Sequence, residues 1–268
     1  MLRVFRIDHD GPKYALETAD GRRLIEGDVF AGPPYTTGAK VADGARILSP
    51  VTPSKVVAIG LNYKDHAAEM NKPLPAEPLM FLKPSTSVIG PGDAIRIPPG
   101  STNVHHEVEL AVVIGARGAR NVTEEQAMAS VFGYTIGNDV SERDMQKSDG
   151  QWTRAKGFDS FCPLGPWIET DLGALGLDPT DLEITCTVDG EPRQAGRTSQ
   201  LIFGLPTLIS YISQVMTLLP GDIVLTGTPS GVGPIRPGQR VDCTIEGLGT
   251  LSNTVVAAEA VSTAGGVR

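Results

Sequence analysis

The first fifty residues alternate apolar and polar positions in short runs that are separated by turn residues. This alternation predicts strands at about 2–7, 14–18 and 22–26, because successive side chains of a strand point to opposite faces. The connecting stretches, DHDGPK and ADGR, have the Asp and Gly residues of tight turns. We therefore expect a small N-terminal antiparallel meander, and Pro50 and Pro53 favour a boundary after it.

Beyond this boundary, strand-like runs alternate with short helical patterns. The stretch KVVAIG is typical of a buried strand, and NYKDHAAEM predicts a short helix. Thr123 and Gln126 have the spacing of a capping box, which predicts a helix to about Val131. SERDMQ fits another helical turn. Further strands are expected in FGYTIGND, in LEITCTV with a DG hairpin turn, and in DIVLTG, RVDCTIEG and TLSNTVV.

An amphipathic helix is expected to begin at Leu205-Pro206, because proline suits the first helical turn. Apolar residues then recur at helical spacing. The predicted buried face consists of Leu208, Ile209, Ile212, Val215 and Met216. With the strands, this helix predicts a mixed α/β, β-rich fold, in which residues 1–52 form a small N-terminal β domain and residues 53–268 form the main domain.

Composition narrows the class of protein. The net charge of −8 opposes non-specific binding to nucleic acid. No apolar run approaches the length that crosses a bilayer, so we expect no membrane partner. The three cysteines, Cys162, Cys186 and Cys243, have no metal-ligand spacing and are expected to be buried and reduced, which favours a cytoplasmic location.

The stretch HHEVELAVVIG raises a question of charge. On a strand, Glu107 and Glu109 share a face with Ala111 and Val113, so two adjacent carboxylates begin a face that is otherwise apolar. We expect this strand to be half-buried. Two carboxylates on such a face repel each other and resist desolvation, so either water reaches them or a cation neutralises them. A solvated face is the ordinary interpretation of an isolated E-x-E.

Asp139, at the end of GYTIGND, favours the cation. A third carboxylate would complete an all-oxygen set that suits Mg²⁺ or Mn²⁺. The alternative for Asp139 is an N-cap of the following helical turn. His105 and His106 lie beside the glutamates, but we interpret them as structural hydrogen-bonding residues outside the site.

His66 and Glu69 form a second candidate pair. Their spacing of three puts them on one helix face, where a carboxylate can orient an imidazole that takes a proton from water. A surface ion pair is the alternative for an isolated pair of this kind.

Six stretches, in order from about residue 55 to 234, resemble the fumarylacetoacetate hydrolase family. They read IGLNYKDHAAEM, FLKPSTSVIGPGD, HHEVELAVVIG, GYTIGNDVSERD, WTRAKGFDSFCPLGP and LLPGDIVLTGTPSGVGP. The resemblance implies a β-roll like the C-terminal domain of that family, a homodimer, and a Mg²⁺ ion, with Mn²⁺ or Ca²⁺ as alternatives. Its ligands would be Glu107, Glu109 and Asp139.

By the same resemblance, His66 and Glu69 would activate water, and Lys156 would stabilise developing negative charge. A surface lysine with a buried stem is the alternative for Lys156, and a solvated turn is the alternative for Arg143 and Gln146. The positions that the resemblance assigns to substrate binding are Lys83, Arg143, Gln146 and Thr228.

The expected reaction is hydrolysis of a C–C bond in a small acylpyruvate-type 2-oxo acid, with the cation as Lewis acid. Isomerisation or decarboxylation of a related 2-oxo or 2-hydroxydienoic diacid (2-hydroxyhepta-2,4-diene-1,7-dioate or oxaloacetate) is the alternative within the family. A non-catalytic, metal-stabilised domain that binds a small acid is the alternative of another class. Residues 62–78 are expected to act as a lid over the substrate.

Overall fold

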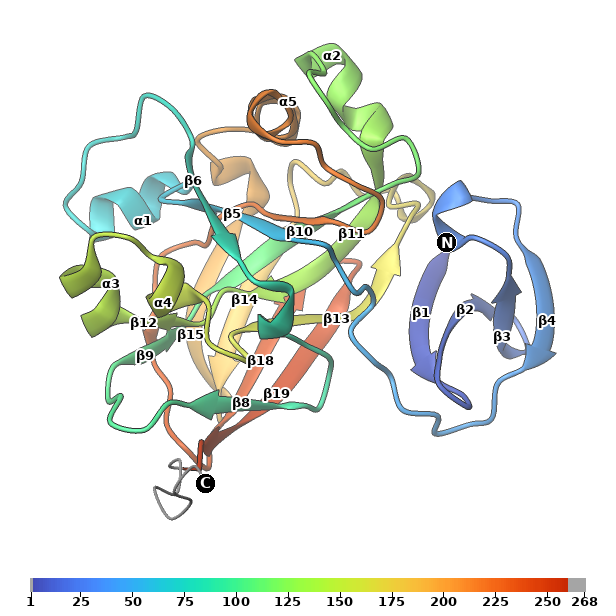
Figure 1. The fold of residues 1–268 in the computed structure, drawn as a ribbon, viewed down its shortest axis with the longest axis horizontal. Helices are drawn as coiled ribbons and strands as arrows, with labels where there is room; N and C mark the ends of the chain where they lie inside the picture. The colour runs from blue at the N-terminus through green and yellow to red at the C-terminus, as the bar shows by residue number, and fades with distance from the viewer. Residues whose placement is uncertain (1, 260–268) are drawn as a thin grey trace, which may run out of the picture.

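The computed structural model describes residues 2–259, and most of its strands belong to one long sheet (Figure 1). These strands are β1 (Arg3–Asp8), β2 (Pro12–Thr18), β3 (Gly21–Glu26), β4 (Thr36–Lys40), β5 (Val56–Gly60), β6 (Leu79–Lys83), β7 (Val88–Ile89), β10 (Val108–Ile114), β11 (Val131–Asn138), β13 (Cys162–Glu169) and β16 (Ile223–Leu225). They are ordered β4-β3-β2-β1-β13-β11-β10-β16-β5-β6, and β7 pairs with β13.

Two smaller sheets complete the β-structure. The five-stranded sheet contains β15 (Glu191–Arg197), β14 (Glu183–Val188), β18 (Arg240–Ile245), β19 (Gly249–Ala257) and β8 (Ala94–Ile97), in that order. The three-stranded sheet contains β12 (Ser141–Glu142), β9 (Val104–His106) and β17 (Gly233–Pro234). The α-helices are α1 (Lys64–Glu69), α2 (Glu124–Ala127), α3 (Arg143–Asp149), α4 (Thr153–Lys156) and α5 (Leu205–Val215).

The predicted N-terminal meander is confirmed, and it lies to one side of the remaining chain (right in Figure 1). It joins the long sheet through antiparallel pairing of β1 with β13, where Val4 faces Ile168. The strand β4 was not predicted, because TTGAK lacks apolar alternation and most of its side chains are exposed. The division of the chain at residue 52 stays a prediction.

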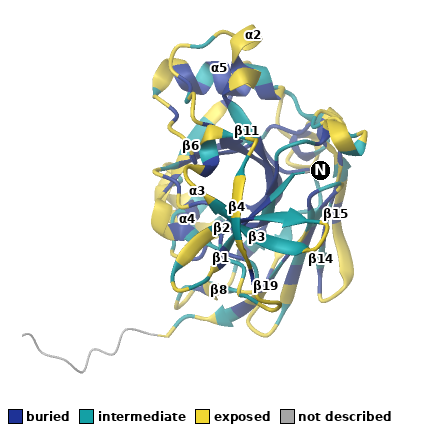
Figure 2. Ribbon diagram, turned by 90° about the vertical axis from the view of Figure 1, so that its right-hand side faces the viewer, coloured by how far each residue is buried: buried dark blue, intermediate teal, exposed yellow. Residues whose placement is uncertain are grey.

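The strand β10 is buried on both faces, so the prediction of a half-buried strand was wrong. All seven of its residues are buried. Val108 and Leu110 belong to a core cluster that includes residues of the five-stranded sheet and α5, whereas Ala111 and Val113 belong to a second cluster with β5 and β13. Figure 2 shows this buried interior in dark blue, with exposed residues on loops and outer helix faces. A central strand with cover on both sides has no solvated face.

Local turn and cap predictions were confirmed. Thr123 and Gln126 form the expected capping box at the start of α2. Asp189 and Gly190 form the two-residue turn that joins β14 to β15. Their φ angles of 54° and 82° are both positive, as a type I′ hairpin turn requires. Leu208, Ile209 and Ile212 of α5 are buried as expected.

Val215 is the exception on α5, because it is 59% exposed. It is the last residue of the helix, and the helical repeat of about 100° per residue puts it at the margin of the buried arc. Met216, the next residue, does contact the core. The prediction was therefore wrong for Val215 alone.

The strands β13 and β6 of the long sheet were missed as well. β13 has the sequence CPLGPWIE, and its two prolines argue against a strand because proline cannot donate to the ladder. β6 has the sequence LMFLK, a short apolar run between prolines that pairs only with β5 in the long sheet. Both strands support the site described below.

The cysteine prediction agrees with the structure, since all three thiols are free and buried. Within residues 2–259, no helix is both long enough and apolar enough to span a membrane.

Candidate active site

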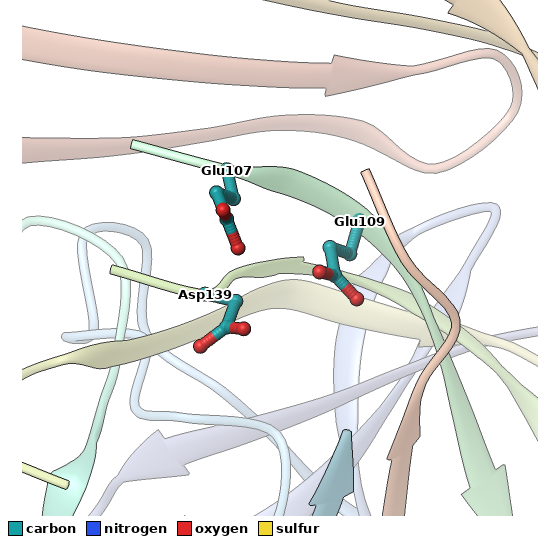
Figure 3. Close-up of side chains that lie close together, drawn as sticks. All are labelled: Glu107, Glu109 and Asp139. Carbon is teal, nitrogen blue, oxygen red and sulfur yellow. The ribbon is translucent and has the colours of Figure 1, made fainter. Parts of the chain in front are cut away.

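Three buried carboxylates converge where β9, β10 and β11 meet (Figure 3). Glu107 occupies the one-residue gap between β9 and β10, Glu109 lies on β10, and Asp139 directly follows β11. One oxygen from each carboxylate lies within 4.8 Å of the other two. The exposed fractions of the three residues are 5%, 1% and 1%, so the interpretation of a solvated face does not hold.

The backbone around Glu107 fixes this convergence. Its N–H donates to Asn138 Oδ1 over 2.9 Å, and its carbonyl accepts from the Asp139 N–H over 2.8 Å. Two of the acidic residues are thus tied together by their own backbones. Asp139 is not the N-cap of α3, because Glu142 takes that role by accepting from the Met145 N–H over 2.6 Å.

Cationic side chains bind two of the carboxylates. Lys156 Nζ lies 2.7 Å from Glu107 Oε2 and 2.6 Å from Asp139 Oδ2. Lys83 Nζ lies 2.6 Å from Asp139 Oδ1, and Arg143 Nη2 bonds to Glu107 Oε1. The lysine side chains are at most 3% exposed, so the interpretation of Lys156 as a surface lysine does not hold.

Among residues 2–259, no cationic side chain forms an ion pair with Glu109. Its Oε2 accepts a hydrogen bond of 2.6 Å from the Gly227 N–H. Burial, together with the nearby charges of Asp139 and Glu107, raises the pKa of Glu109 well above its ordinary value. The Glu107 carboxyl behaves in the opposite way: burial acts to raise its pKa, but Arg143 and Lys156 outweigh burial and hold that pKa well below the ordinary value.

The chemistry of this donor set fits a hard divalent cation. All three groups are carboxylates, and Mg²⁺ and Mn²⁺ prefer oxygen ligands. The raised pKa of Glu109 reflects burial of its charge first and repulsion by Asp139 and Glu107 second, and a cation would offset both. Glu107, Glu109 and Asp139 are the residues that could hold it.

His66 and Glu69 form the predicted contact on α1. His66 Nδ1 lies 2.9 Å from Glu69 Oε2, and the His66 side chain is 9% exposed. The other oxygen of Glu69 accepts from the Gly231 N–H over 3.1 Å. A second contact of α1 joins Asp65 Oδ2 to Ser230 Oγ over 2.8 Å. The pair is therefore part of a bonded arrangement between α1 and the loop after β16.

His66 and the carboxylates face the same cavity, which has a volume of about 450 Å³. It is lined by the three carboxylates and by several of the other predicted site residues, which are His66, Lys156, Arg143, Gln146 and Thr228. Glu69 and Lys83 do not line it: Glu69 contacts His66, and Lys83 contacts Asp139 and the carbonyls of Val140 and Lys156. Apolar side chains also line the cavity, namely those of Ile59, Leu61, Met70, Leu79, Trp152 and Val232.

Arg143 and Gln146 lie on one face of α3. Arg143 Nη1 donates to Gln146 Oε1 over 2.9 Å while its other terminal nitrogen bonds to Glu107. The guanidinium thus connects the carboxylate cluster to the cavity wall. This helix position was predicted from the motif, whereas the contact with Glu107 was not.

Some lining residues were missed by sequence reasoning. His105 lies in the cavity wall, with Nε2 2.9 Å from Asn103 Oδ1, and burial followed by the Arg143 charge lowers its pKa to about 4. His106 is buried, and its Nδ1 lies 2.9 Å from Gln194 Oε1. Neither histidine belongs to the carboxylate cluster. Only their adjacency to Glu107 in the sequence could have indicated this placement.

Comparisons with known proteins identify a family and relatives of this chain. The family profile described as fumarylacetoacetate (FAA) hydrolase C-terminal matches residues 55–256. A mitochondrial oxaloacetate tautomerase of Homo sapiens is 41% identical over 289 residues, covering 95% of this chain and 91% of its own length.

Two solved structures are similar throughout. The crystal structure of 2-hydroxyhepta-2,4-diene-1,7-dioate isomerase from Mycobacterium marinum has a TM-score of 0.86 at 45% identity, covering 96% of this chain and 100% of that chain. Maleylpyruvate hydrolase from Sphingobium sp. SYK-6, in complex with manganese(II) ion and pyruvate, has a TM-score of 0.78 at 30% identity, with the same coverage of 96% and 100%.

Proposed function

The chain belongs to the fumarylacetoacetate hydrolase family, and from this premise we propose that it is a Mg²⁺-dependent hydrolase of a small acylpyruvate-type 2,4-dioxo acid. The observation that carries the proposal is that His66, oriented by its contact with Glu69, lines the same cavity as the three carboxylates. Hydrolysis needs an activated water, and this pair can supply the base.

Glu107, Glu109 and Asp139 would hold the cation, with Mn²⁺ or Ca²⁺ as alternatives to Mg²⁺. When bound, a cation of this kind acts as a Lewis acid toward the two oxo oxygens of a dioxo acid. The carboxylates themselves are fixed by backbone contacts and by buried lysines, so the ligand set is formed before substrate arrives.

His66 would take the proton from water. The Glu69 carboxylate accepts the hydrogen of Nδ1, which leaves the lone pair of Nε2 as the base. The water oxygen forms a bond to the distal carbonyl carbon, and the C–C bond next to it breaks. The electron pair of that bond moves into the 2-oxo acid half, whose carbon then takes a proton, so the products are pyruvate and a carboxylic acid.

Lys156 would stabilise the negative charge that develops on the 2-oxo acid half. Burial acts to lower the pKa of its ammonium group, but Asp139 and Glu107 outweigh burial and keep that pKa above the ordinary value. The group is therefore a buried positive charge held in a fixed position. Arg143 and Gln146 would bind the substrate carboxylate from α3, and Thr228 would contact the substrate from the loop after β16.

A second candidate function is isomerisation, tautomerisation or decarboxylation of a related diacid. It is favoured by the relatives whose names state an oxaloacetate tautomerase and a 2-hydroxyhepta-2,4-diene-1,7-dioate isomerase. These reactions need charge stabilisation but no attacking water. They predict a smaller role for His66 than hydrolysis does.

A chelation-controlled substrate screen tests both functions. Purified protein is mixed with acetylpyruvate, oxaloacetate or a hydroxymuconate-type diacid, with Mg²⁺ or with a chelator, and products are identified by mass spectrometry. Release of pyruvate and a carboxylic acid, abolished by chelation and by His66→Ala, supports hydrolysis. Rearranged or decarboxylated product that persists in His66→Ala supports the second candidate. Mg²⁺ binding with no turnover of any acid would favour a non-catalytic domain.

Three further expectations belong to the same proposal. We propose a homodimer, which light scattering tests, and a cytoplasmic location, which fractionation tests.

We also propose that residues 62–78 close over the substrate. Asp65 and Glu69 already join α1 to the loop at Ser230 and Gly231, while residues 71–77 are largely exposed. Hydrogen exchange of this segment should slow when an inhibitor binds, and unchanged exchange would argue against a lid.

A further inference from the structure

Thr228 lines the cavity, and its hydroxyl has defined hydrogen-bond partners. Its hydroxyl belongs to a closed ring of three hydrogen bonds with Val108 and Gln194, and all three residues are at least 96% buried. Gln194 comes from β15 of the five-stranded sheet and does not line the cavity. The ring therefore joins a cavity residue to a part of the fold outside the cavity.

The direction of every bond in this ring follows from one fixed donor. The Val108 N–H can only donate, and it lies 3.1 Å from Gln194 Oε1. This identifies the amide oxygen, so the other end is Nε2, which donates to Thr228 Oγ1 over 2.7 Å and to the Pro229 carbonyl over 2.8 Å. The Thr228 hydroxyl consequently accepts from Gln194 and must place its own hydrogen elsewhere.

That hydrogen has a partner already. Thr228 Oγ1 donates to the Val108 carbonyl over 2.8 Å, which closes the ring. Turning the hydrogen into the cavity would leave a buried carbonyl without this partner, which is unfavourable. A hydroxyl has one donor and two acceptor positions, so only one lone pair of Thr228 remains for the cavity.

The loop that carries Thr228 is held against β15 in the orientation that the ring requires. Gly231 has φ of +92°, and a Cβ there would lie 2.1 Å from the Arg193 carbonyl oxygen. The loop backbone thus contacts the strand directly beside Gln194. The ring is a built feature of this contact and does not depend on a mobile surface side chain.

We propose that Thr228 acts only as a hydrogen-bond acceptor toward the bound substrate, and that Gln194 is the positioning residue that enforces this. The cavity would accordingly select an acid that presents a hydroxyl hydrogen, such as the enol form of a 2-oxo acid, over one that presents only carboxylate oxygens at this position. The choice of substrate class rests on the proposed function, whereas the polarity of Thr228 rests on the ring alone.

Binding of two small probe acids tests the polarity. Glycolate carries a hydroxyl donor, and oxalate at pH 7.5 carries only acceptors. Their dissociation constants are measured by calorimetry with Mn²⁺ present, for wild type, Thr228→Val and Thr228→Ser. Thr228→Val should weaken glycolate relative to oxalate by roughly fivefold, the value of one hydrogen bond, and Thr228→Ser should retain the wild-type ratio.

Gln194→Met, which removes the amide at similar volume, tests the positioning role. As a single substitution, Gln194→Met should shift the ratio of the glycolate and oxalate dissociation constants in the same direction as Thr228→Val does. Added to Thr228→Val, it should cause no further shift. A residue with a merely structural role would not change this ratio selectively. If Gln194→Met does not fold, the Thr228 pair of variants still tests the acceptor.

The inference is overturned if Thr228→Val weakens oxalate more than glycolate, if it leaves the ratio unchanged, or if wild type binds neither acid. It is also overturned for Gln194 if the two substitutions shift the ratio independently. Because both acids are non-reactive probes, the result is separate from turnover. Failure of the substrate screen would reject the proposed hydrolase without changing these binding ratios.

Discussion

Ion pairs occur both at the carboxylate cluster and on the surface, but their surroundings differ. In the buried pair, the side chains of Lys83 and Asp139 are 0% and 1% exposed. In the surface pair, the side chains of Arg197 and Asp181 are 46% and 55% exposed. An exposed pair contributes little because water competes with it, and a buried pair must offset a large loss of hydration.

The difference teaches where to look for function. Replacing a buried ion pair by apolar residues is often neutral or stabilising, so stability alone does not explain three buried acids held with two buried lysines and a partly buried arginine. The surface pairs need no explanation beyond solvation. If the buried set is a functional site, substitutions in it should change stability or turnover strongly. Substitutions in the surface pairs should change both only slightly.

Asp139→Ala should have the largest effect on stability. It leaves Lys83 Nζ and Lys156 Nζ buried without one of their partners, which costs on the order of 3–5 kcal/mol. Urea unfolding with a chelator present measures the change. The matched control is Asp181→Ala, which removes an exposed partner of Arg197 and should lower the free energy of unfolding far less. Equal losses in the two variants would show that burial of the pair has no special consequence.

His66→Ala should affect turnover far more than stability. Loss of a general base lowers the rate by roughly 10²–10⁴-fold, while the contact with a partly exposed Glu69 contributes little to folding. Steady-state kinetics and thermal melting of the same samples measure the two effects. Retention of near-normal pyruvate release in His66→Ala would remove the hydrolytic role from this residue.

Glu109→Gln should change how stability depends on pH in the metal-free protein. The folded pKa of Glu109 lies above its ordinary value of 4.5, so the folded state binds a proton more tightly than the unfolded state. Stability from this group is fully present below pH 4.5 and is lost as pH rises through the raised pKa. The loss is about 1.4 kcal/mol for each tenfold difference in proton affinity between the two states.

The glutamine of Glu109→Gln does not titrate. The free energy of unfolding of this variant should therefore fall less between pH 5 and pH 9 than that of wild type. Urea unfolding with a chelator at both values measures the difference. Glu77→Gln, at an exposed position, serves as the control and should follow wild type. A wild-type profile that runs parallel to that of Glu109→Gln would contradict the assigned repulsion.

Arg197→Ala should have the smallest effect. The arginine is 46% exposed and bonds to Asp181 on the surface, so its removal should barely change the free energy of unfolding and should leave turnover unchanged. The same urea titrations and kinetic assays apply. A loss as large as that of Asp139→Ala would erase the contrast between the two regions.

The sequence predicted those features that local chemistry determines. The alternation of the first strands, the capping box at Thr123 and the hairpin at Asp189-Gly190 depend on neighbouring residues, and they were confirmed. The convergence of Glu107, Glu109 and Asp139 followed from strand alternation combined with the motif. It required no knowledge of the remaining fold.

Features that depend on distant parts of the chain were missed. Lys83 contacts Asp139 and Gln194 contacts Thr228 over sequence separations of 56 and 34 residues, which no local pattern encodes. The strand β13 was hidden by its two prolines. The burial of β10 on both faces depends on the five-stranded sheet and on β5, so alternation alone favoured a half-buried strand.

Titration of Mn²⁺ into metal-free protein by calorimetry tests the central claim most directly. Wild type should bind one ion per chain, Glu109→Ala should remain folded yet lose this binding, and Glu77→Ala should bind like wild type. Full affinity of Glu109→Ala for the ion, or the absence of a saturable site in wild type, would contradict the assignment of the three carboxylates as its ligands.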